Sequence, residues 1–188
     1  ADWNPVIQTF DYVEQILVPA GCYQSGADEF CIEKAFWLDR YEVTNALYGK
    51  REITRFNNQP VVNVTWQEAK RFCESRGGRL PSDIEWQYAA SGPDGFIYPW
   101  GNFFNGTFAN SCDSRCILEG HDSTYDDGYD YLASVGSYPQ GISWVGAYDM
   151  SGNAAEWVNT GEETSMRLVY GGSWGDDANQ LSTTSHEL

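Results

Sequence analysis

The chain has 188 residues, with 27 Asp and Glu against 11 Lys and Arg, and its formal net charge is −16. A surface this acidic repels phosphate backbones and anionic headgroups, which argues against nucleic acid and membrane partners and favours metal cations. The content of 41% hydrophobic and 15% aromatic residues excludes an acidic disordered tail, and no run reaches the roughly 20 apolar residues needed for membrane insertion.

The first predicted elements are two strands. Residues 16–23 and 35–41 are rich in apolar and aromatic side chains, and we expect them to pair as an antiparallel ribbon. Two helices follow, because Thr65 with Glu68 and Ser82 with Glu85 have the spacing of capping boxes. We expect both helices to be short and amphipathic, and the first to end at the glycine pair 77–78.

Helical and strand periodicity largely disappears over residues 92–138, which are rich in Gly, Asn, Asp, Ser and aromatic residues. A loop of this length is either disordered or held by specific interactions. Strands are expected again at 144–148, 156–158 and 167–170, and no element is recognisable after Asp176. Without repeats or a linker, residues 1–188 are expected to form one α+β domain.

The five cysteines suggest two local disulfides, Cys22 with Cys31 and Cys112 with Cys116, and leave Cys73 as a buried structural thiol. This pattern fits an extracellular or secreted protein, at the cell surface or in the periplasm. An alternative is a partial zinc site made by Cys112, Cys116 and His121.

Six segments occur in order along the chain: FWLDRYEVTN (36–45), PVVNVTW (60–66), GRLPSDIEWQYAA (78–90), YPWG (98–101), YDMSGNAAEW (148–157) and GGSW (171–174). In this order they resemble the sulfatase-modifying-factor family, also called formylglycine-generating-enzyme-like. The resemblance extends over about residues 13–174 and leaves 175–188 as an atypical tail.

The resemblance implies a C-type-lectin-like fold with small twisted antiparallel sheets, two main helices and long calcium-stabilised loops. The family includes copper-dependent oxidases that convert cysteine to formylglycine, iron enzymes, receptor-binding domains and domains without known catalysis. The fold therefore leaves the function open.

Residues 122–130 hold four carboxylates around a glycine, which suits either bound calcium or a solvated acidic loop. The resemblance favours structural calcium. It implies one site at Asn110, Ser111, Asp127 and Tyr129, and a second at the turn formed by Ser151, Gly152, Ala154 and Glu156. In the second site Glu156 supplies a carboxylate, the other three supply carbonyls, and Asn153 shapes the turn.

The resemblance also permits a test for oxidase chemistry. The positions that match the family's copper-binding cysteine pair are Asp176 and Leu181, and neither side chain binds soft copper. Iron needs three imidazoles or a triad of two histidines and one carboxylate, and we expect the two histidines of the chain, His121 and His186, to be surface residues. We therefore expect neither copper nor iron. The family's closing strand is also missing after Trp174, which would leave a sheet edge open.

We expect a non-catalytic, extracellular, calcium-stabilised binding or assembly module whose partner is a protein or a like subunit. A glycan ligand stays open but unsupported. One alternative is a diverged oxidoreductase of the formylglycine-generating type, and another is a subunit of an extracellular filament or surface layer. The recognition face would use loop aromatics and the GGSW turn, unless these side chains simply cover a small core: Phe96, Tyr98, Trp100, Phe103, Phe104, Trp144, Ser173 and Trp174.

Overall fold

The computed structural model describes residues 3–49, 57–160 and 165–188. An N-terminal antiparallel sheet has the strand order β1-β2-β5, formed by β1 (Ile7–Phe10), β2 (Val13–Val18) and β5 (Phe36–Asp39). The predicted pairing of the two first segments is confirmed, since Leu17 lies opposite Trp37. The predicted strand 16–23 is two strands, because Pro19, which has no N–H to donate, follows the end of β2.

The second part of that segment is β3 (Gly21–Ser25), which forms a hairpin with β4 (Asp28–Ile32). Cys22 lies opposite Cys31 in the register and the two are disulfide-bonded. The other predicted disulfide, Cys112 with Cys116, is also present. Both predicted pairings are confirmed, and the second excludes the zinc alternative because its thiols are bonded to each other.

Both predicted helices are present with both halves of their capping boxes: α2 (Trp66–Ser75) and α3 (Asp83–Ser91). The helix α2 ends shortly before Gly77, which has a φ of 78°. In contrast to the prediction, α3 is not amphipathic, because most of its C-terminal half is buried. A third helix, α1 (Asn45–Tyr48), was not predicted; at four residues it is too short to show a periodic pattern.

A small sheet closes the chain with the order β6-β7-β8, formed by β6 (Glu156–Trp157), β7 (Val169–Tyr170) and β8 (His186–Glu187). The prediction of no element after Asp176 is wrong, because His186 pairs with Tyr170 and their rings are in contact. The edge that we expected to be open is therefore covered by β8. A strand of two residues has no alternation that a sequence could reveal.

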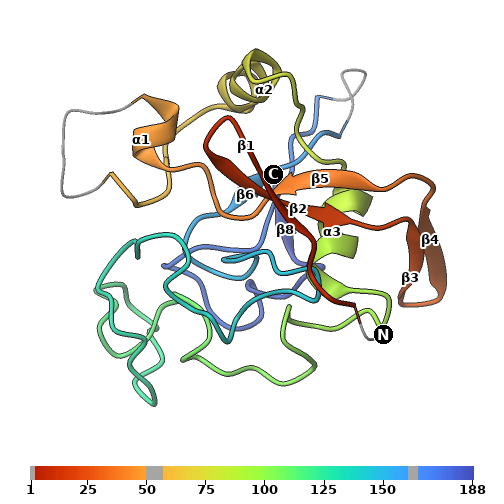
Figure 1. Cartoon of the computed structure of the whole chain (residues 1–188). Coiled ribbons are helices and arrows are strands. Elements are labelled where there is room, and N and C mark those ends of the chain that lie inside the picture. Colours follow the sequence, from red (N-terminus) through yellow and green to blue (C-terminus); the bar gives the residue numbers. More distant parts are fainter. Residues whose placement is uncertain (1–2, 50–56, 161–164) are drawn as a thin grey trace.

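Residues 92–155, which are all described, contain no helix or named strand. The predicted strand at 144–148 is wrong: the segment forms a buried turn in which Gly146 has a φ of 94° and the Ala147 carbonyl accepts from the Ser143 N–H. Figure 1 shows this part of the chain as loops, coloured green to light blue, beside α3 and below the N-terminal sheet.

The main core surrounds α3. Trp86, Ile16, Val18, Val145 and Val158 all have no exposed surface. These residues come from α3, from β2 and from the segments after α3, so the core joins the N-terminal helices and strands to the loops that follow them. Burial of such side chains contributes about 1.5–3 kcal/mol each. None of the helices in the described parts of the chain is long and apolar enough to cross a membrane.

Candidate metal sites

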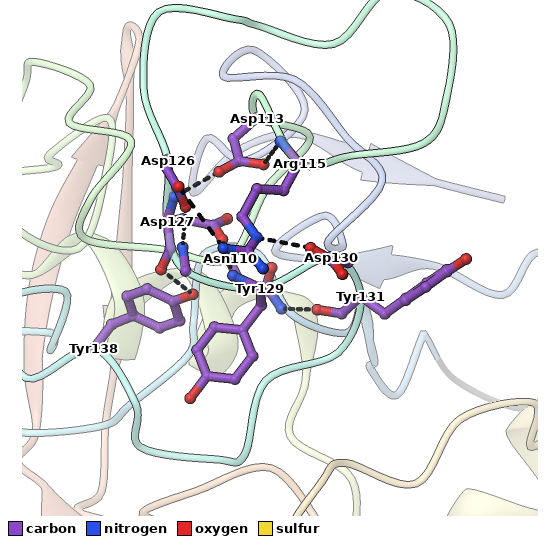
Figure 2. A network of polar contacts seen from close by, with 10 residues as sticks. Asn110, Asp113, Arg115, Asp126, Asp127, Tyr129, Asp130, Tyr131 and Tyr138 are labelled. Carbon is purple, nitrogen blue, oxygen red and sulfur yellow. Dashed lines mark hydrogen bonds and ion pairs between the residues drawn. The ribbon is translucent and has the colours of Figure 1, made fainter.

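The first expected calcium site lies where the acidic loop folds back onto residues 110–113 (Figure 2). The Asp127 carboxylate accepts hydrogen bonds from the N–H groups of Ser111 at 2.8 Å and Tyr129 at 2.9 Å. Burial raises the pKa of Asp127 to about 6, and the charges of Asp113 and Asp126 act in the same direction. The structure thus brings three of the four expected residues together around one partly buried carboxylate.

Asn110 completes this group. Its side chain is 1% exposed, and its Nδ2 donates to the Tyr131 carbonyl at 2.9 Å and to Asn153 Oδ1 at 2.8 Å. Its Oδ1 is buried and has no hydrogen-bond partner among the described residues. An unpaired buried acceptor is costly, and a bound cation would satisfy it. Calcium prefers amide, carboxylate and carbonyl oxygens, so the residues present fit this ion.

The other acidic side chains of the loop do not join the site. Asp122, Asp126 and Asp130 are exposed. Asp130 accepts from Arg115 Nε at 2.7 Å, and Asp126 lies 3.8 Å from the same guanidinium. The solvated-loop alternative therefore describes three of the four carboxylates, and only Asp127 points to residues 110 and 111.

Sequence reasoning missed a fully buried carboxylate, Asp113, inside the disulfide loop. Its oxygens accept from the N–H of Arg115 at 2.8 Å and the N–H of Asp127 at 2.5 Å. It therefore holds the backbone of the acidic loop against residues 112–116. The signal was an Asp directly after Cys112, but a sequence does not show which Asp of an acidic protein is buried.

The second expected site is the turn at residues 149–156. Asp149, Gly152 and Asn153 have positive φ values of 56°, 80° and 63°. A Cβ on Gly152 would collide with the carbonyl of Asn110, so only glycine fits there. Ser151, Gly152 and Ala154, the three residues expected to supply carbonyls, are all buried.

Glu156 provides the carboxylate of this turn. Its Oε2 accepts from Trp86 Nε1 at 2.7 Å. Burial raises the pKa of Glu156 to about 7, and the negative charges of Asp149 and Asp39 add to the effect. A carboxylate kept partly neutral by burial gains stability from a nearby cation, so the second group of residues also fits calcium.

A second buried carboxylate, Glu42, lies behind this turn. Its Oε1 accepts from the Ala154 N–H at 2.9 Å and its Oε2 from Asn153 Nδ2 at 2.6 Å. Burial, with the charges of Asp149 and Glu156, raises the pKa of Glu42 well above its usual range. Sequence reasoning quoted Glu42 only as part of a motif and assigned it no role.

The positions that match the copper cysteines have structural contacts. Asp176 Oδ2 accepts from both the N–H and the hydroxyl of Ser173 at 2.7 Å. Leu181 is fully buried in a cluster with Tyr98 and Ala109. His121 and His186, which we expected at the surface, are both exposed.

The structure does not bring the expected recognition residues together as an exposed face. Phe103 is 88% exposed, whereas Phe96, Tyr98, Trp100, Phe104, Trp144, Ser173 and Trp174 are half-buried or buried. Trp144 donates to the Tyr88 carbonyl at 2.8 Å, and Trp174 packs edge-on against Tyr131. Most of these side chains cover the core, as the alternative interpretation predicts.

A cavity of about 570 Å³ lies between α2, β5 and residues 154–157. Its lining includes Phe36, Trp37, Phe72, Trp157 and the free thiol of Cys73. Burial raises the pKa of Cys73 to about 11, which keeps it a neutral thiol at physiological pH. The thiol is half-buried on the cavity wall and not fully buried as predicted, while its neutral form makes it a poor nucleophile.

Comparison with known proteins places these observations in one family. The sulfatase-modifying factor enzyme 1-like domain matches residues 48–187. An inactive C-alpha-formylglycine-generating enzyme 2 from Bos taurus is 34% identical over 151 residues, which is 78% of this chain and 47% of that protein. A formylglycine-generating enzyme from Thermomonospora curvata is 39% identical over 111 residues, 56% of this chain and 34% of the enzyme.

Among solved structures, PvdO from Pseudomonas aeruginosa aligns with a TM-score of 0.77 at 19% identity, covering 98% of this chain and 92% of that chain. This similarity shows a shared fold. The chain spans about half the length of the curated inactive relatives that it matches. The predicted α+β fold is confirmed, and the chain belongs to the sulfatase-modifying factor, or formylglycine-generating-enzyme-like, family.

Proposed function

We propose that this protein is a non-catalytic, calcium-stabilised, extracellular module that binds a protein partner. The observation that carries the non-catalytic part is Leu181, a fully buried aliphatic side chain at a position where copper-binding relatives have a thiol. The match to inactive enzyme 2 supports the same conclusion. A buried Leu cannot bind a metal, and the side chain of Asp176 is occupied by Ser173.

In this proposal calcium is held at two places. Asn110 Oδ1 and the Asp127 carboxylate, with the carbonyls of Ser111 and Tyr129, would hold one ion. The N–H groups of Ser111 and Tyr129 donate to Asp127, which keeps both residues beside that carboxylate. Glu156 and the carbonyls of Ser151, Gly152 and Ala154 would hold the other. The ions supply positive charge that offsets buried carboxylates and fixes loops that lack regular hydrogen bonding.

The extracellular location rests on the two disulfides, which persist in oxidising compartments. The proposed protein partner rests on the negative surface, which disfavours nucleic acid and anionic membranes as partners. The alternative of a filament subunit was based on an open sheet edge, and this reason no longer holds because β8 pairs with β7 at that edge.

The test measures metal content and redox activity together. Protein treated with a chelator and dialysed against calcium should hold about two calcium ions by elemental analysis, and titration with cuprous ion should produce neither stoichiometric binding nor oxygen consumption. An Asp176→Cys/Leu181→Cys double variant is the matched control for the copper measurement. Tight copper binding with turnover by the natural chain would instead establish the alternative, a diverged oxidoreductase.

A further inference from the structure

We propose that a buried relay of three side chains, Glu42, Asn153 and Asn110, couples the two calcium sites, so that an ion bound at one site raises the calcium affinity of the other. The inference rests on the calcium binding proposed above. It adds that the two sites act as one unit and assigns a positioning role to Glu42 and Asn153, which are not themselves proposed to bind calcium through their side chains.

The relay is a chain of hydrogen bonds in one direction. Asn153 Nδ2 donates to Glu42 Oε2 at 2.6 Å, and Asn110 Nδ2 donates to Asn153 Oδ1 at 2.8 Å. The exposed fractions of the three residues are 9% for Glu42 and 1% for each asparagine. Because both amides donate toward Glu42, the Oδ1 of Asn110 is left without a partner among the described residues, directly before Ser111, whose N–H binds Asp127 of the first site.

Two backbone groups outside the relay fix the orientations of the two amides, one group for each amide. The Ala133 N–H donates to Asn153 Oδ1 at 2.9 Å, so this atom must be the oxygen. The Tyr131 carbonyl accepts from Asn110 Nδ2 at 2.9 Å, so this atom must be the nitrogen. A flipped amide would place like groups against each other at either position.

The same residues form part of the second site. Asn153 lies within the turn whose neighbouring carbonyls are proposed ligands, and its N–H donates to the Asn110 carbonyl at 2.9 Å. Glu42 holds the turn directly through the Ala154 N–H at 2.9 Å. An ion that orders this turn therefore also orders Asn153, and through it the free oxygen of Asn110. Buried hydrogen-bond networks of this kind polarise along their length, and coupling between two binding sites is reciprocal.

The experiment is a calcium titration by isothermal calorimetry on chelator-treated protein. Glu156→Gln removes the carboxylate of the second site and Asp127→Asn that of the first, so each variant reports one site alone. We expect the overall two-ion association constant of the natural chain to exceed the product of the two single-site constants by roughly 5- to 150-fold. Equality would overturn the coupling and leave calcium binding intact. Failure of the natural chain to bind calcium would instead refute the proposed function.

The relay itself is tested by Glu42→Gln, which leaves every proposed ligand in place. The coupling factor is the ratio of the two-ion association constant to the product of the two single-site constants. When Glu42→Gln is measured alone and combined with Glu156→Gln or with Asp127→Asn, this factor should fall toward one. Asn153→Asp, which keeps the acceptor oxygen but loses the N–H to Glu42, serves as a second variant if Glu42→Gln does not fold by circular dichroism.

Asp149→Asn is the matched control. It removes another buried carboxylate, one that accepts from the Gly136 N–H at 2.6 Å, and Asn tolerates the positive φ at this position. It should keep the coupling factor of the natural chain. Equal loss of coupling in Asp149→Asn would show a general effect of negative charge and overturn the relay.

Discussion

Residues 92–155 contain no helix or named strand, whereas most of the regular elements lie before them. In α2 and α3, backbone groups pair with their own near neighbours and side chains cap the ends. In residues 92–155, backbone N–H groups donate to side chains that are distant in sequence. The Asp127 N–H donates to the Asp113 carboxylate, and the Ala133 N–H donates to the Asn153 amide oxygen. The helices therefore depend on local sequence, whereas residues 92–155 depend on long-range polar contacts and, in our proposal, on calcium.

The largest effect on stability should come from a substitution in the core that the helices and the loops share. Trp86→Ala removes a fully buried ring and its hydrogen bond to Glu156, and we expect it to lower the free energy of unfolding by about 3–5 kcal/mol. Urea denaturation measures the change. Phe103→Ala is the control, because that ring is 88% exposed and its removal should cost less than about 0.5 kcal/mol. Similar losses in both variants would contradict the assigned core.

Calcium removal should affect the loops of residues 92–155 more than the helices. At a free calcium concentration about 100 times the dissociation constant, one bound ion stabilises the fold by about 2.7 kcal/mol, and a chelator should abolish this. Hydrogen exchange should then accelerate over residues 110–131, while the amides of α3 stay protected. Uniform acceleration through α3 would show that the ions support the whole fold and not the loops alone.

A smaller effect is expected at a local cap. Ser82→Ala removes the hydroxyl that accepts from the Glu85 N–H at the start of α3, and the expected loss is about 1 kcal/mol. Because the cap is local, the loss should be the same with and without calcium in thermal or urea unfolding. Ser82→Asn, which retains a capping oxygen, should recover most of the stability. A loss of stability that depends on calcium would contradict the conclusion that the helices depend on local sequence and the loops on calcium.

The smallest effect concerns Cys73, whose pKa burial raises from 9.0 to about 11. The fold therefore favours the neutral thiol: this contribution to stability is complete below pH 9 and is lost as the pH rises through 11. At pH 8 iodoacetamide should label Cys73 slowly in the native protein and rapidly in urea. Equal rates in both conditions would show that the thiol is open to solvent.

Sequence reasoning worked where the signal was local. The capping boxes located α2 and α3, and cysteine spacing located both disulfides. It failed at residues 144–148, where apolar residues form a buried turn, and at β8, which has only two residues. Six ordered motifs sufficed for the family, and residues of different motifs meet in the fold: Trp86 donates to Glu156, and Asn153 donates to Glu42.

The sequence by itself determined the net charge of −16, the two helices, the disulfides and the family. Only the tertiary structure decided which acidic residues matter, because burial and hydrogen-bond partners depend on chain segments far apart. Glu42 and Asn153 are 111 residues apart and Asn110 and Asn153 are 43 apart, yet they bond directly. Of the four carboxylates in residues 122–130, three face solvent and only Asp127 turns inward, a distinction that composition and spacing do not carry.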